Sequence, residues 1–243
     1  MAPEIIFEDS ELLVLNKPQG LMVHGDGRTE EYTLAEWILE HRPAVAGVGE
    51  QWTTPQGVHI PRPGIVHRLD KETSGIMLVA KTPEMYTWLK QQFFDRTIHK
   101  EYRALVHGQV LEENGKIDKP IGKSASDFRK YSAQRGAKGA TRDAITRYTV
   151  LKRIPDDEFP DNKGKGYTLL AVFPETGRTH QIRVHLKSLH HPVVGDSLYG
   201  ESQGNGVGFT TLALQAIRVT VPYADGSERA FEVPLRTDFK NIA

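Results

Sequence analysis

The chain has 243 residues, of which 38% are hydrophobic and 26% charged, a composition typical of a globular protein with one large or two small domains. It contains no cysteine, which excludes disulfides, thiolate catalysis and cysteine zinc sites. No apolar run approaches the roughly eighteen residues of a membrane span, and the acidic start lacks the features of a signal peptide. We therefore expect a cytoplasmic protein without a membrane partner.

Formal charges are distributed unevenly along the chain. Basic and acidic side chains both number 31, so the net charge is zero. Residues 1–50 nevertheless hold ten acidic and three basic side chains, whereas residues 116–153 hold eleven basic and three acidic ones. Such a basic stretch either contacts phosphates or forms an ordinary solvated surface, and charge alone does not separate the two readings.

The first part of the chain predicts two strands, a helix and a loop. The apolar runs at residues 4–7 and 12–15, separated by an Asp-Ser turn, predict strands. A capping box formed by Thr33 and Glu36 starts a helix that ends before Pro43. The following residues, up to 64, are rich in proline and glycine, and this composition predicts an irregular loop.

A buried strand and a second helix are expected next. The unbroken apolar run Ile76-Met77-Leu78-Val79-Ala80 is typical of a strand buried on both faces. Thr82 followed by Pro83 starts the helix. Its apolar side chains fall on one face and are expected to lie in the core: Met85, Trp88, Leu89 and Phe93.

Strands dominate the second half of the chain. They are expected at residues 100–106, 144–151 and 167–173, with a closing hairpin of residues 211–221 and 229–233. The remaining segments predict a loop or weak strands at residues 117–135, polar loops at 155–166 and 200–208, and a helix at 179–189. Strands outnumber helices without regular alternation, so the expected fold class is α+β around a mostly antiparallel mixed sheet with flanking helices and loops.

The segment from His67 to Gly75, HRLDKETSG, has the features of a catalytic loop. It places Asp70 just before the buried strand, between an apolar residue and a Thr-Ser-Gly turn. Gly75 allows a positive φ, and the Thr and Ser hydroxyls can bind the loop backbone, so we expect a rigid loop. Arg68 and Lys71 flank Asp70 with positive charge, which favours the ionised carboxylate.

This segment resembles the catalytic motif of the RluA-type pseudouridine synthases, RNA-modifying enzymes that convert uridine into its carbon-linked isomer. Three more segments resemble motifs of the same family, in the family's order: residues 16–20 (NKPQG), 100–102 (KEY) and 177–185 (GRTHQIRVH), the last followed by His191-Pro192 and Gly195-Asp196. The resemblance implies a long mixed sheet whose central cleft holds the catalytic aspartate, and no cofactor. Because the first motif begins at residue 16, we expect a single catalytic domain over residues 1–243, without a separate N-terminal RNA-binding domain.

The resemblance also implies roles for three catalytic residues. Asp70 matches the family's carboxylate, which acts at the ribose as a nucleophile or as a base. Tyr102 matches the tyrosine whose ring stacks on the target base and whose hydroxyl is a candidate for removing the proton from carbon 5. Arg183 matches an arginine that would keep a buried Asp70 ionised through a salt bridge.

Four further residues are candidates for RNA binding. Arg68 is the candidate to fill the gap left by an extruded base, with a phosphate contact or a structural ion pair as its alternative role. Lys71 lies in the same motif as Arg68, and Arg178 and His180 lie in the motif at residues 177–185. All three are expected to contact RNA.

Competing chemistries fit the residues less well. The histidines at 67, 180, 185, 190 and 191 have no carboxylate at a metal-ligand interval, so we expect no metal. Ser74, His67 and Asp70 lie too close together in one tight loop for a hydrolytic triad. Asp70 and Glu72 are too near one another for a glycosidase pair.

We therefore hypothesise a cofactor-free, monomeric RNA pseudouridine synthase that acts on structured RNA, with large-subunit ribosomal RNA favoured as substrate. Two alternatives stay open: a transfer RNA pseudouridine synthase of the same family, and a non-catalytic RNA-binding or RNA-chaperone protein. The intact set of Asp70, Tyr102 and Arg183 favours an enzyme. No obligatory protein partner is expected.

Overall fold

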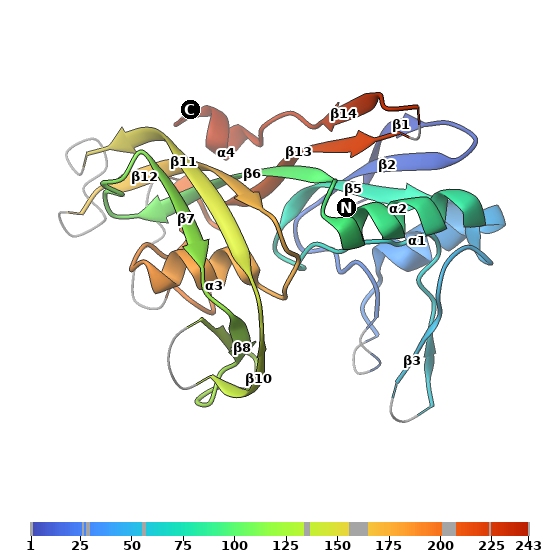
Figure 1. Cartoon of the computed structure of the whole chain (residues 1–243), viewed down its shortest axis with the longest axis horizontal. Coiled ribbons are helices and arrows are strands. Elements are labelled where there is room, and N and C mark those ends of the chain that lie inside the picture. The colour runs from blue at the N-terminus through green and yellow to red at the C-terminus, as the bar shows by residue number, and fades with distance from the viewer. Residues whose placement is uncertain are drawn as a thin grey trace. The chain divides into compact units, whose positions relative to one another are not determined.

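Antiparallel strand pairs make up most of the regular secondary structure (Figure 1). This computed structural model describes residues 2–25, 27, 30–54, 57–133, 137–155, 165–200, 208–223 and 225–242. The chain divides into two compact units. Unit 1 comprises Met1–His99 and Ala216–Val233, and unit 2 comprises Lys100–Gln215 and Pro234–Ala243. Unit 1 thus combines the N-terminal strands with the hairpin near the C-terminus.

The strands of unit 1 are neighbours in the order β1-β2-β5-β13, and β14 pairs with β13. Their bounds are β1 Glu4–Glu8, β2 Leu12–Lys17, β5 Ser74–Ala80, β13 Leu214–Pro222 and β14 Glu228–Glu232. Every residue of β5 is buried, as its apolar sequence predicts. The register of β2 against β5 sets Lys17 opposite Gly75, so the first motif leaves its strand beside the loop that precedes β5.

The two helices of unit 1 begin at their predicted caps. In α1 (Leu34–His41), the Thr33 hydroxyl accepts from the backbone of Glu36, whose carboxylate accepts from the Thr33 backbone in return. In α2 (Pro83–Asp95), Thr82 is the N-cap and Pro83 the first residue. The capping residues therefore predicted the first residue of each helix correctly.

Two expectations for unit 1 need correction. In α2 only Leu89 and Gln92 are buried, whereas Met85, Trp88 and Phe93 are half-buried, because the face of the helix that packs inward is narrower than its apolar stripe. The segment expected to be an irregular loop contains regular structure as well. It folds into a short 3-10 helix and a small hairpin: η1 Pro43–Val45, β3 Trp52–Thr53 and β4 His59–Ile60.

Unit 2 contains four neighbouring antiparallel strands in the order β6-β12-β11-β7. Their bounds are β6 His99–His107, β7 Asn114–Asp118, β11 Ile145–Ile154 and β12 Tyr167–Pro174. Buried side chains of β6, β11 and β12 form one apolar cluster with Ile182 and Leu186 of α3 (Gln181–Ser188) and Phe239 of α4 (Thr237–Lys240). Ile182 and Leu186 thus face the core from α3, and Leu189 packs half-buried against the same cluster.

Helix α3 starts two residues later than expected. His180 precedes it with a left-handed backbone, φ 55°, which interrupts the helical geometry, and the helix begins at Gln181. The basic segment at residues 117–135, expected to be a loop or weak strands, contains two weak strands, and a third strand that was not expected follows it. They make a second sheet in the order β10-β8-β9, with bounds β8 Ile121–Lys123, β9 Tyr131–Ser132 and β10 Lys138–Arg142.

The α+β class and the mostly antiparallel sheet are confirmed. The expected polar loops fall largely on residues 156–164 and 201–207, which lie outside the described residues. Within the described ranges, no helix has the length and apolar character needed to cross a membrane.

Candidate active site

The loop before β5 presents Asp70 on a hydrogen-bonded turn. The backbone N–H of Thr73 donates to the Asp70 carbonyl over 3.1 Å, and Leu69, one residue earlier, is buried. The Asp70 side chain itself is half-buried. The turn thus holds the backbone that follows Asp70. The expectation that the Ser74 hydroxyl binds the loop backbone is wrong, because its buried Oγ has no hydrogen-bond partner among the described residues.

The first motif binds the backbone of this loop. Lys17 and the N–H of Gly20 both donate to the carbonyl of Lys71, over 3.2 and 2.9 Å, and the Gln19 amide donates to the carbonyl of Glu72 over 2.7 Å. Two segments more than fifty residues apart are therefore joined by three hydrogen bonds. Each bond ends within two residues of Asp70.

Lys17 is the buried cation of this arrangement. Its side chain is fully inaccessible, and its Nζ donates to the carbonyls of Pro18 and Leu21 over 2.9 and 2.8 Å in addition to that of Lys71. Three acceptors match the three protons of an ammonium. Burial lowers the pKa of Lys17 to about 7, and the nearby carboxylates of Asp70 and Glu72 oppose this shift.

One end of the loop is fixed to β5, and the other packs closely against β13. At the start, the His67 ring accepts a hydrogen bond at Nε2 from the backbone N–H of Leu78 over 2.8 Å and stacks on Phe93 of α2. At the end, Gly75 has φ 117°, and a Cβ there would lie 2.0 Å from the carbonyl oxygen of Ala216 in β13. Only glycine fits such a close approach of two backbones. His67 therefore has a structural role that its sequence position did not predict.

Several positive groups lie near Asp70 along the chain. Arg68 is exposed, and its Nη1 lies 3.4 Å from Nε2 of His24. Arg62 stacks over Trp52 at 5.1 Å, and burial, followed by the proximity of Arg68, lowers its pKa from the ordinary value. Lys71 forms an exposed ion pair with Glu31. The charges of Arg62 and Arg68 in unit 1 therefore repel one another, and a bound anion would reduce this repulsion.

In unit 2, Tyr102 lies in β6 opposite Val172 of β12. It is half-buried and packs against the apolar cluster of this unit. Its position near the middle of a strand is the one predicted, and the strand pairing fixes its backbone.

Arg183 is held by a buried carboxylate. Its Nε and Nη2 donate to Asp196 over 2.7 and 2.8 Å, and the two side chains are 4% and 0% exposed. Asp196 also accepts from the backbone N–H groups of Leu198 and Tyr199, each over 3.0 Å. Two parallel charge-assisted bonds fix the plane of the guanidinium. The predicted pairing of Arg183 with Asp70 stays a prediction.

Tyr199 connects α3 with the three-stranded sheet β10-β8-β9, the small sheet of unit 2. Its ring lies 5.2 Å from the Arg183 guanidinium carbon. Its hydroxyl accepts from the backbone N–H of Tyr131 in β9 and lies 2.9 Å from Nδ1 of His180. Arg178, by contrast, donates through Nε to the carbonyl of Asp143.

A buried polar network holds α3 against β11. Gln181 donates to Thr146 over 3.0 Å, and the Thr146 hydroxyl then donates to Nδ1 of His185 over 2.9 Å. The His185 Nε2–H donates to the carbonyl of Lys119, and burial lowers the pKa of this histidine. His185 is therefore a neutral, structural member of the motif at residues 177–185, and both of its ring nitrogens form hydrogen bonds.

Comparison with known sequences identifies the family. A sequence model of the RNA pseudouridylate synthase family matches residues 11–188, a span that includes all four motif segments. The chain belongs to the RluA-type RNA pseudouridine synthases. The predicted membership of this family is therefore confirmed.

Curated relatives in this family are longer than the chain. The uncharacterized RNA pseudouridine synthase YlyB of Bacillus subtilis is 34% identical over 240 residues, covering 98% of this chain and 71% of the relative. The ribosomal large subunit pseudouridine synthase D of Pseudomonas aeruginosa is 40% identical over 197 residues, covering 81% of this chain and 53% of the relative. The chain spans about half to two-thirds of the length of most curated relatives it matches.

Two solved human proteins have the same fold. RNA pseudouridylate synthase domain containing 1 superposes with a TM-score of 0.72 over 96% of this chain and 83% of its own length. RNA pseudouridylate synthase domain containing 4 gives 0.71 over 98% and 90%. Both are 24% identical to this chain, so the likeness concerns the fold.

Each unit thus contains part of the predicted site. Unit 1 joins the motifs at residues 16–20 and 67–75, and unit 2 joins Arg183 and His180 of the motif at residues 177–185 through Tyr199. Lys17 and Asp196 lie in quoted sequence segments but were given no role, and Tyr199 was not singled out. Lys17 and Asp196 stand inside or beside the recognised motifs, and this proximity was the signal that could have singled them out.

Proposed function

We propose that this protein isomerises uridine to pseudouridine in RNA, with Asp70 as its catalytic carboxylate. In this reaction the bond from ribose C1′ to N1 breaks, the base rotates, and a bond from C1′ to C5 forms. The proton on C5 is released and N1 takes up a proton, so the atoms balance without an oxidant, a reductant or a cofactor. Asp70 acts at the ribose, as a nucleophile or as a base.

Tyr102 and Arg183 complete the proposed catalytic set. Tyr102 stacks on the extruded base, an interaction worth roughly 1–3 kcal/mol, and its hydroxyl removes the C5 proton. Arg183 is the proposed cationic partner of the carboxylate. Its guanidinium is fixed by Asp196 before any substrate binds, so the cation needs no reorganisation during the reaction.

The observation that carries this proposal is the support of the Asp70 loop. Lys17, Gln19 and Gly20 bind the two carbonyls that follow Asp70, and the turn N–H binds the carbonyl of Asp70 itself. A loop whose backbone is held at consecutive residues presents its carboxylate in one position. Catalysis at a defined atom of a ribose requires this kind of preorganisation.

The proposed RNA contacts are Arg68, Lys71, Arg178 and His180. Arg68 is exposed beside the like-charged Arg62, which favours a phosphate or the gap of an extruded base. Lys71 would exchange its exposed partner Glu31 for RNA, an exchange that costs little because such surface pairs are weak.

We propose large-subunit ribosomal RNA as the substrate class. Several curated relatives at 35% to 40% identity are ribosomal large subunit pseudouridine synthases D by name. The protein is proposed to act as a monomer without an obligatory protein partner.

The test is release of tritium from RNA labelled at uridine C5. Ribosomal RNA and transfer RNA are offered separately to the wild type, to Asp70→Asn, and to Glu72→Gln, which removes a carboxylate from the same loop. We expect release from ribosomal RNA by the wild type and Glu72→Gln, and none by Asp70→Asn. Turnover by Asp70→Asn would remove that residue from the mechanism, and release from transfer RNA alone would overturn the substrate proposal.

A further inference from the structure

The small sheet of unit 2 is anchored firmly to α3. Ile121 of β8 and Ala144 lie in one buried apolar cluster with Val184 of α3 and Tyr199, and Tyr131 of β9 packs against this cluster. The Tyr131 backbone also donates to the Tyr199 hydroxyl over 2.9 Å. One side of the sheet is therefore fixed, and its remaining side chains are presented on a rigid support.

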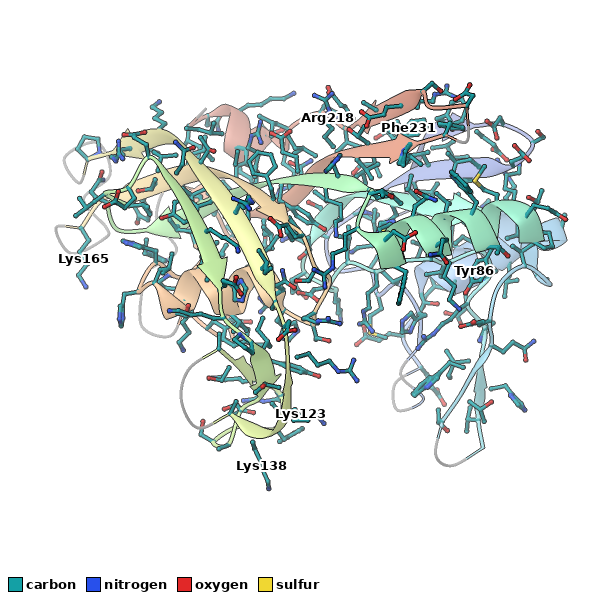
Figure 2. The ribbon with its side chains drawn as sticks, in the orientation of Figure 1. Tyr86, Lys123, Lys138, Lys165, Arg218 and Phe231 are labelled. Atoms are coloured by element: carbon teal, nitrogen blue, oxygen red, sulfur yellow. The ribbon has the colours of Figure 1, made fainter. Side chains whose placement is uncertain are left out.

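Two lysines oppose one another on this sheet. Lys123 of β8 and Lys138 of β10 are direct partners in the antiparallel register, and both are exposed. Figure 2 shows both on the small sheet. Opposed side chains on such strands have Cβ atoms about 4.5–5.5 Å apart, and like charges placed there destabilise the pair. Among the described residues, neither lysine forms an ion pair with a carboxylate. An anion between the two ammonium groups would relieve this repulsion.

An exposed aromatic ring lies on the connection between β8 and β9. Phe128 is 82% exposed, although burial of such a side chain would stabilise the fold by roughly 1.5–3 kcal/mol. The connection is not loose, because the Asp127 carboxylate accepts from both the backbone and the guanidinium of Arg129. The Ser124 N–H also donates to the Lys130 carbonyl over 2.9 Å. The ring is therefore held outward by an ordered turn.

We propose that this sheet is a second RNA-binding site, specific for a single-stranded segment. Lys123 and Lys138 hold one phosphate between them, and Phe128 stacks on a neighbouring base. The combination decides the ligand class: an acidic peptide would satisfy the lysines alone, whereas a nucleotide supplies both an anion and a flat aromatic face. Bases within a duplex are already stacked on one another, which restricts the site to unpaired nucleotides. The inference rests on the proposed function, in that the bound strand belongs to the RNA substrate.

Binding of a fluorescein-labelled oligouridine of about twelve nucleotides, followed by anisotropy, tests the site. A blunt RNA duplex of similar length is measured beside it. Phe128→Ala should weaken oligouridine binding about 5- to 150-fold and duplex binding much less, while Phe128→Trp should retain wild-type affinity. Replacing both lysines by glutamine should reduce the slope of log Kd against log salt by about 0.7, the value for one phosphate of a single strand.

Two control variants match these changes. Phe94→Ala removes a ring of α2 that is 81% exposed, and Lys152→Gln removes an exposed charge of β11; both should bind as the wild type does. Equal affinities of wild type and Phe128→Ala for oligouridine would overturn the second site and leave the proposed isomerisation standing. A wild type that binds neither RNA would overturn the second site, and tritium release from ribosomal RNA would decide the proposed isomerisation separately. Tritium release that is absent despite Phe128-dependent binding would overturn the proposed isomerisation alone.

Discussion

The geometry of the buried pair of Arg183 and Asp196 predicts how much stability the Asp196→Asn variant loses. In the native pair, one carboxylate oxygen accepts from Nη2 and from the N–H groups of Leu198 and Tyr199, and the other accepts from Nε. If the asparagine oxygen takes the first position, its NH2 group faces the Nε–H, so a donor meets a donor and the guanidinium loses its counter-charge. Breaking a buried pair in this way costs roughly 3–5 kcal/mol.

This cost converts into a melting temperature. Unfolding entropy of about 2.1 cal/mol/K per residue gives about 0.5 kcal/mol/K for a chain of this length. Asp196→Asn should therefore lower Tm by about 6–10 °C in a calorimetric scan. Asp118→Asn, which breaks the exposed pair with Lys116, serves as the control and should shift Tm by no more than about 2 °C.

A second variant separates the lost pair from general damage. Adding Arg183→Met to Asp196→Asn removes the stranded guanidinium, and the asparagine oxygen still accepts the two backbone N–H groups. The double variant should therefore melt above Asp196→Asn alone. An Asp196→Asn protein that melts with the wild type, or a double variant that melts lower still, would refute the reasoning.

Two further changes test the support of the Asp70 loop. Because burial depresses the pKa of Lys17 to about 7, the penalty on its charged form applies below that pH and is relieved as pH rises toward the unfolded value. The unfolding free energy of the wild type relative to Lys17→Met should therefore rise by about 3 kcal/mol between about pH 6 and pH 9 in denaturant titrations; a constant difference would contradict this. Gly75→Ala should be strongly destabilising because its Cβ meets the Ala216 carbonyl, whereas Gly20→Ala, at φ 82° in open space, should cost only about 1–2 kcal/mol; equal denaturation midpoints would count against the close approach.

Local patterns predicted most of the elements. The capping residues Thr33 and Thr82 located both helix starts of unit 1, and the apolar run of β5 predicted a fully buried strand. These features depend on neighbours within a few positions, so the sequence alone contains the information. The Asp70 loop was found for the same reason, since a polar turn directly before a buried strand is a local signal.

Tertiary partners could not be predicted in this way. The half-buried state of Trp88 depends on how much of α2 packs inward, and the left-handed backbone of His180 depends on contacts made by the folded unit. Asp196 was visible only as part of a motif, and its pairing with Arg183 appears once a turn brings residues thirteen apart together. Tyr199 gave no signal because its partners come from β9 and α3.

The acceptors around the two buried cations explain why one is a lysine and the other an arginine. Lys17 meets three carbonyl oxygens that lie around one nitrogen, and a compact ammonium with three protons satisfies them. Arg183 meets the two oxygens of one carboxylate, and only a planar guanidinium donates two parallel bonds to such a pair. An apolar pair would be about as stable as a buried salt bridge, so stability alone does not account for Arg183. Each ion instead contributes to the geometry of the proposed site. Lys17 holds the backbone after Asp70 in unit 1, and Asp196 fixes the guanidinium of Arg183 in unit 2.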